Sequence, residues 1–120
     1  MRLASAKTAL TRGEAFARGV LCNVLVGLAV WLAMGARSVT DKIVAVVFPV
    51  AAFVAIGFEH SIANSFFLPY AITLDGQGAV PVGGAALNLL IVTGGNIVGG
   101  TLLVAGAYWL GYLRGGQSNK

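Results

Sequence analysis

Four polar side chains lie close together inside a long apolar stretch of this sequence. They are Glu59, His60, Ser61 and Asn64. Mostly apolar residues fill the chain on both sides, over residues 43–56 and 65–74. A charge at the centre of a membrane helix costs about 2.5–3.5 kcal/mol on insertion scales. We therefore expect these side chains to face protein or water rather than lipid, which makes this stretch the first candidate for a functional site.

His60 is the only histidine, and its neighbours at helical spacing are informative. Phe53 precedes it by seven residues, Asn64 follows by four and Phe67 by seven. In a roughly helical region these residues share one stripe, with the histidine and an amide between two aromatic constrictions. There, His60 can donate a hydrogen bond or a proton to a small anion that has shed its water. The alternative is that His60 only bonds a neighbouring helix.

Three further polar residues allow a structural interpretation. Glu59 lies about 100° away from His60 on a helix, and we expect it to fasten a broken helix by accepting hydrogen bonds from exposed backbone amides. Asn23 and Asn96 lie in two other apolar segments. Each either joins helices, through a bond that contributes about 0.6–2 kcal/mol, or lines the same pathway as His60. Their spacing does not decide between these roles.

The composition is that of a membrane protein. Hydrophobic residues make up 58% of the chain and charged residues 10%, whereas soluble domains have about 25% charged residues. The basic residues lie in the terminal segments and one short loop, so we interpret them as cationic membrane flanks rather than a nucleic-acid surface. One histidine and one distant cysteine, Cys22, give no metal-ligand spacing. Without a nucleophile–base pair as well, we predict no cofactor, no metal and no enzymatic activity.

Three hydrophobic segments position the polar residues, and they predict an all-α integral membrane protein. The segments are residues 18–36, 43–74 and 85–113, with a basic N-terminal segment 1–17, a loop 75–84 and a polar tail 114–120. The middle segment is too long for one upright helix and too short for two spans of about 20 residues. We predict three crossings, the second broken at its centre, where Pro49, Gly57 and Pro69 can each disturb helical hydrogen bonding.

Local patterns add detail to these segments. Thr11 and Glu14, three residues apart, predict a capping box at the start of a short helix. Gly95 and Gly99 form a small-xxx-small spacing, which lets two helix backbones approach closely. An aromatic belt at a membrane interface is predicted from Tyr108, Trp109 and Tyr112.

Three stretches of the chain resemble the formate/nitrite transporter family, in the order in which that family has them. GFEHSIANSFFLPYAI, residues 57–72, resembles the segment around the family's central histidine. RGVLCNVLVGLAVWLA, residues 18–33, resembles its fourth membrane helix. NLLIVTGGNIVGG, residues 88–100, together with the Tyr108-Trp109 pair, resembles its sixth.

The resemblance implies half of an aquaporin-like inverted-repeat fold, one pore per protomer and a homopentamer. It implies passage of small monovalent anions such as formate, nitrite or hydrosulfide, with proton coupling left open. It matches His60 to the central pore histidine and Phe53 to a phenylalanine of a hydrophobic constriction. It matches Asn23 and Asn96 to asparagines that face the pathway, and Glu59 to the acid beside the histidine.

Family members have six membrane helices in two inverted halves, and this chain resembles the second half. We expect its partners to be the lipid bilayer, small anions, and either further copies of the chain or a complementary N-terminal half. The expected location is the bacterial inner membrane. The alternative is a truncated membrane fragment that does not transport without a partner half. A pore for water or neutral solutes is disfavoured, because the chain lacks the paired Asn-Pro-Ala motif of aquaporins.

Overall fold

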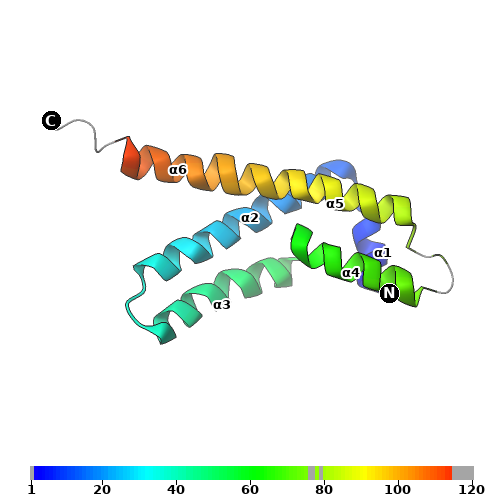
Figure 1. The fold of residues 1–120 in the computed structure, drawn as a ribbon, viewed down its shortest axis with the longest axis horizontal. Helices are drawn as coiled ribbons and strands as arrows, with labels where there is room; N and C mark the ends of the chain where they lie inside the picture. The colour runs from blue at the N-terminus through cyan, green and yellow to red at the C-terminus, as the bar shows by residue number, and fades with distance from the viewer. Residues whose placement is uncertain (1, 76–77, 79, 115–120) are drawn as a thin grey trace.

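The computed structural model describes residues 2–75, 78 and 80–114, and over these residues it contains helices and no strand (Figure 1). In chain order the elements are α1 (Arg2–Thr8), α2 (Arg12–Gly35), α3 (Val39–Ile56), α4 (Ser61–Leu74), α5 (Val82–Ile97), η1 (Val98–Ala105), α6 (Gly106–Tyr108) and η2 (Trp109–Leu113). The last four form one continuous rod, in which η1 and η2 are π-helical. The sequence pattern did not predict these π-helical turns.

Three helical segments are long and apolar enough to cross a membrane. They are Arg12–Gly35, Val39–Ile56 and Val82–Leu113. The apolar α4 is shorter, and it continues away from the end of α3 after an interruption at residues 57–60 (Figure 1). Together α3 and α4 form the broken crossing, so the prediction of three crossings with one broken helix is confirmed.

The start of α2 is fixed by the capping box predicted from Thr11 and Glu14. Thr11 Oγ1 accepts a hydrogen bond from the Glu14 amide at 3.3 Å, and Glu14 Oε2 accepts one from the Thr11 amide at 3.0 Å. The helix that it opens is the long membrane helix rather than a short one, so α2 begins before the expected segment 18–36. Ser38 and Asp41 form a second capping box at the start of α3.

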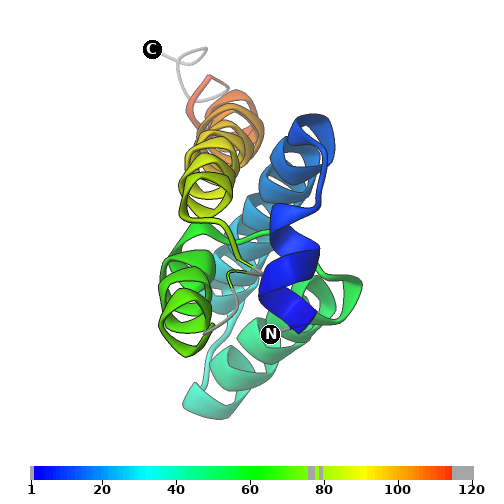
Figure 2. The ribbon, with the colours of Figure 1, turned by 90° about the vertical axis from the view of Figure 1, so that its right-hand side faces the viewer.

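The basic N-terminal segment contains the short helix α1, which folds back onto the rest of the molecule. α1 packs against α4 and α5 (Figure 2). A small buried cluster joins these elements: Ala4, Leu68, Ala71, Val80 and Ala85. This packing brings Lys7, near the end of α1, next to the interruption between α3 and α4.

Glycines let α2 and α5 cross at very short range. A Cβ atom built on Gly95 would lie 2.5 Å from the carbonyl oxygen of Phe16, and one built on Gly19 would lie 2.9 Å from that of Val92. Gly99 meets the backbone of Val20 in the same way. The close approach predicted from the Gly95–Gly99 spacing is therefore confirmed, and side chains of α5 next to the crossing reach the backbone of α2.

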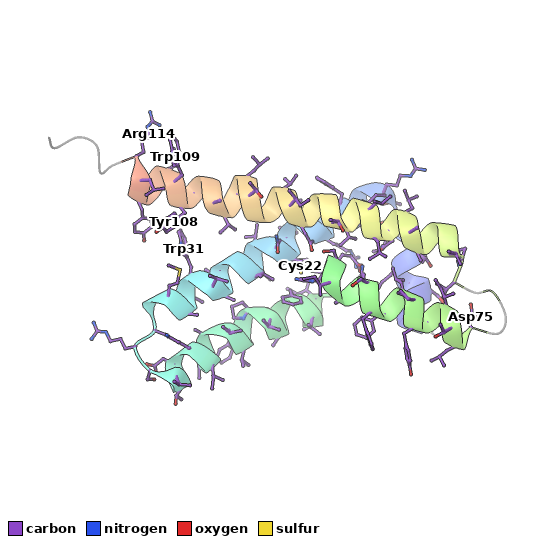
Figure 3. The ribbon with its side chains drawn as sticks, in the orientation of Figure 1. Cys22, Trp31, Asp75, Tyr108, Trp109 and Arg114 are labelled. Carbon is purple, nitrogen blue, oxygen red and sulfur yellow. The ribbon has the colours of Figure 1, made fainter. Side chains whose placement is uncertain are left out.

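Aromatic side chains lie between the C-terminal half of α2 and the end of the long rod (Figure 3). The Trp31 ring lies 6.2 Å from that of Tyr108 and 6.1 Å from that of Tyr112, centroid to centroid. Trp109 and Arg114 lie on the opposite side of the rod from Tyr108 (Figure 3). Trp31 of α2 thus contacts two of the three residues of the predicted aromatic belt, whose place at a membrane interface stays a prediction.

The glycine crossing generates a matched pair of substitutions. Gly95→Ala places a methyl group against the Phe16 carbonyl, so we expect a loss of about 1–3 kcal/mol in the free energy of unfolding, which is typical of overpacking. Gly94→Ala meets no atom within 4 Å, and the better helix propensity of alanine makes it neutral or slightly stabilising. Denaturant titration in detergent micelles measures both variants. Equal stability of the two would contradict the close crossing.

Candidate functional site

The interruption between α3 and α4 begins at a glycine in the left-handed region. Gly57 has φ 76° and ψ 35°, a conformation that side chains rarely adopt. The Phe58 amide donates back to the Phe53 carbonyl at 2.9 Å, which closes the last turn of α3. His60 is extended, with φ −112° and ψ 121°, and directly precedes α4. The helix stops at Gly57, so the condition of a roughly helical region, on which the stripe through His60 depended, is not met, whereas the predicted break is present.

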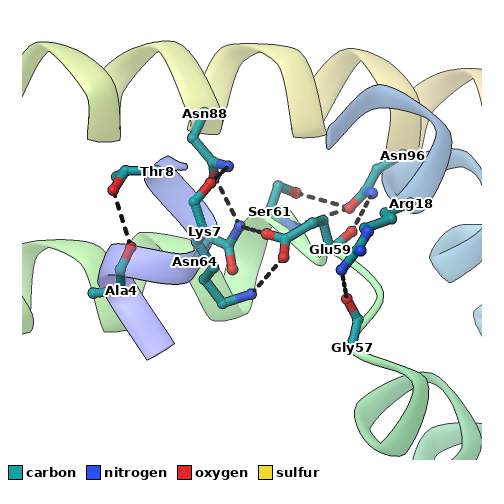
Figure 4. A network of polar contacts seen from close by, with 10 residues as sticks. All are labelled: Ala4, Lys7, Thr8, Arg18, Gly57, Glu59, Ser61, Asn64, Asn88 and Asn96. Carbon is teal, nitrogen blue, oxygen red and sulfur yellow. Dashed lines mark hydrogen bonds and ion pairs between the residues drawn. The ribbon is translucent and has the colours of Figure 1, made fainter. Parts of the chain in front are cut away.

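One side chain satisfies two of the backbone groups that this interruption exposes (Figure 4). Asn96 of α5 donates from Nδ2 to the Glu59 carbonyl at 3.0 Å, and its Oδ1 accepts from the Ser61 amide at 3.0 Å. Oδ1 also accepts from Ser61 Oγ at 3.1 Å. His60 makes no side-chain cap at the start of α4, so Asn96 acts as that cap from another helix.

The same asparagine ties the interruption to α2. Its Nδ2 donates a second hydrogen bond to the Gly19 carbonyl at 2.9 Å, and Asn23 Nδ2 donates to the Asn96 carbonyl. Asn96 is buried, and both of its amide hydrogens are engaged within the protein. Both asparagines thus join helices here, and a direct contact of either with a passing ion stays a prediction.

Glu59 is 2% exposed and forms a buried charged cluster. Its Oε1 lies 2.9 Å from Lys7 Nζ, and its Oε2 accepts from Asn64 Nδ2 at 2.5 Å. The sequence predicts backbone amides as the partners of this carboxylate. Among the described residues the partners are instead side chains, because Asn96 already serves the Ser61 amide and α1 brings an ammonium group within reach.

Asn88 extends this cluster to α5. Asn64 Nδ2 also donates to Asn88 Oδ1 at 3.0 Å, and Asn88 Nδ2 donates to the Lys7 carbonyl at 3.1 Å (Figure 4). We did not single out Lys7 or Asn88 from the sequence. Asn88 carries the signal that identified Asn96, an amide within an apolar segment. Lys7 resembles an ordinary cationic flank, and only the packing of α1 reveals its contact with Glu59.

His60 faces a cavity of about 200 Å³ together with the other residues expected to share its stripe. The lining residues are Lys7, Phe53, Val54, Gly57, Phe58, His60, Ala63, Asn64 and Phe67. The Phe53 and His60 rings are stacked, with centroids 5.9 Å apart and planes inclined by 21°. The imidazole makes no hydrogen bond to another described residue, in contrast to Glu59 beside it. Its nitrogens are thus available to a ligand in the cavity.

These features define a class of protein: a helical membrane protein with a buried polar cluster and a histidine-lined cavity at a broken crossing. The family model described as formate/nitrite transporter matches residues 1–110. The chain belongs to the formate/nitrite transporter family. This is a family of transporters and not of enzymes, which agrees with the prediction that the chain is not an enzyme.

Individual relatives agree with this membership. The "Probable formate transporter" of Methanothermobacter thermautotrophicus is 52% identical over 106 residues, covering 88% of this chain and 38% of that protein. The "Formate channel FocA" of Escherichia coli K12 is 44% identical over 118 residues, covering 84% and 41%. A solved "Pentameric formate channel with formate bound" has a TM-score of 0.83 at 40% identity, covering 93% of this chain and 51% of that one. The chain spans about two fifths of the length of these curated relatives.

The charged cluster yields a stability prediction. Lys7→Met leaves the buried Glu59 carboxylate without its cation, and breaking a buried pair in this way costs about 3–5 kcal/mol. The double variant Lys7→Met/Glu59→Gln removes both charges, so we expect it to recover part of that loss. Lys42→Met, at an exposed position of α3, is the control and is expected to change little. The free energy of unfolding of each variant, measured in detergent micelles, tests this prediction. Equal values for Lys7→Met and Lys42→Met would rule out the buried ion pair.

Proposed function

We propose that this chain forms one side of a transmembrane pathway for small monovalent anions such as formate, nitrite or hydrosulfide, with His60 at its centre. The observation that carries the proposal is the cavity in which His60, without a hydrogen-bond partner among the described residues, lies with Phe53 and Phe67 at a break in an apolar crossing. The names of the relatives, formate transporter and formate channel, support the choice of anion.

In the proposed mechanism, aromatic side chains narrow the pathway and polar side chains bind the anion. Phe53 narrows the path and gives a hydrated ion no hydrogen-bond partner, so the anion sheds water before it reaches His60. Lys7 lines the same cavity, and its ammonium group has donors beyond the one that Glu59 accepts, so it can donate a hydrogen bond to the anion. His60 then donates a hydrogen bond. When protonated it passes the proton to a carboxylate, which leaves a neutral imidazole and a neutral acid that crosses the apolar zone.

The asparagines take two roles in this proposal. Asn64 lines the cavity, and its Oδ1 has no hydrogen-bond partner among the described residues, so we assign Asn64 to the pathway itself. Asn96 and Asn23 support the pathway by holding the interruption in place. Glu59 anchors Lys7 beside the cavity and has a structural role.

Further polypeptide completes the pathway. Only 6% of the apolar window of α3 is buried, so most of this helix faces outward. We propose that a complementary half, or further copies of the chain, covers this face, and that the assembly is a homopentamer, in line with the solved pentameric formate channel. The proposed location is the inner membrane of a bacterium. The exposed α3 also favours the second candidate, a membrane fragment that transports only after pairing with a complementary half.

Uptake of radiolabelled formate into liposomes that contain the chain tests the proposal. His60→Ala is expected to lower the flux about 10-fold or more, because a hydrogen bond to a charged group contributes about 1.5–3 kcal/mol. Ser65→Ala, at an exposed position of α4, is the matched control and should leave the flux unchanged.

Equal flux in His60→Ala and in the unmodified chain would refute the role of the histidine. Flux that requires addition of a separately made N-terminal half of a relative would select the fragment candidate.

A further inference from the structure

A second cavity, of about 280 Å³, adjoins the helix interruption. Its lining residues are Ala6, Lys7, Leu10, Arg18, Gly57 and Glu59. Residues from α1, α2 and the interruption thus line this cavity together. Of these residues, only Lys7 and Gly57 also line the His60 cavity. The two cavities therefore adjoin each other at Lys7 and Gly57, while Arg18 belongs to the second cavity alone.

The charges around this second cavity do not cancel. Lys7 and Glu59 form an ion pair at 2.9 Å and neutralise each other. Arg18 forms no ion pair with a described residue. Glu14, one turn earlier on α2, influences it electrostatically, but its carboxylate is hydrogen-bonded to Thr11 in the capping box. The cavity lining thus carries one net positive charge, on the half-buried Arg18 near the start of α2.

Most N–H donors of the Arg18 guanidinium are not used by other described residues. Nη1 donates to the Gly57 carbonyl at 3.3 Å (Figure 4), and this is its one hydrogen bond to a described residue. A guanidinium has five N–H donors in a planar fork, which matches the two oxygens of a carboxylate or a nitrite. A lysine ammonium in the same place would provide a similar charge but not the fork.

We propose that this cavity binds one small planar monovalent oxyanion, such as formate or nitrite, through a two-pronged contact with Arg18. The proposal rests on the proposed function for the identity of the anion. The bound anion cancels the net charge of the lining. Because Lys7 and Gly57 line both cavities, an anion that leaves Arg18 passes them on its way to His60, so Arg18 recruits the ion before the constriction.

Binding of ¹³C-formate to the purified full chain in lipid nanodiscs, followed by NMR line broadening over a formate titration, tests the proposal. Arg18→Gln is expected to weaken formate binding about 10-fold or more, as for loss of a charge-assisted hydrogen bond. Arg18→Lys keeps the charge and loses the fork, so its affinity should lie between the two. Arg12→Gln removes the same charge from an exposed position of α2 that does not line this cavity, and should bind formate like the unmodified chain.

Three results would overturn the proposal. Equal formate affinity of Arg18→Gln and the unmodified chain would remove Arg18 from the site. Equal weakening in Arg12→Gln would reduce the effect to overall charge. Affinity of Arg18→Lys equal to that of the unmodified chain would exclude the two-pronged contact. Formate binding is measured here without transport. If formate binding depends on Arg18 but the chain carries no flux, the Arg18 site is supported and the proposed function is not.

Discussion

The hydrogen bonds of the Asn96 side chain are the contacts on which the geometry of this molecule depends. A bilayer offers backbone groups no water, so every carbonyl and amide freed by a broken crossing needs a partner within the protein. Asn96 supplies one to the Glu59 carbonyl and one to the Ser61 amide, and it binds the Gly19 carbonyl of α2 as well. It reaches all three because glycines bring α2 and α5 into contact next to it.

This arrangement gives the adjacent residues Glu59 and His60 different roles. The Glu59 carbonyl is held by Asn96 and its carboxylate by Lys7 and Asn64, so every polar group of its side chain is engaged. The extended backbone at His60 turns the imidazole toward a different cavity, where it stacks on Phe53 and keeps its nitrogens free of other described residues. Glu59 is therefore held by contacts within the protein, whereas the imidazole of His60 can bind a ligand in its cavity.

Much of this could be predicted from residue patterns, and the rest depended on long-range packing. The apolar segments gave the crossings, Thr11 and Glu14 the start of α2, and Gly95 with Gly99 the close crossing. The point of interruption at Gly57 was one of three candidates. Lys7 could not be assigned, because its partner Glu59 lies 52 residues away in the chain and a basic N-terminal segment has the same composition whether it flanks a membrane or folds back. Phe53, His60, Asn64 and Phe67 do line one cavity, but tertiary packing and not a continuous helix brings them together.

Asn96 holds the broken crossing in the shape that presents His60 to its cavity. Amide hydrogen exchange, compared between the unmodified chain and Asn96→Leu, tests it most directly. We predict that the Ser61 amide loses its protection in the variant, because its acceptor is Asn96 Oδ1. The Phe58 amide is the internal control and should stay protected, because it donates to the Phe53 carbonyl. Unchanged protection of Ser61 in Asn96→Leu would contradict this role of Asn96.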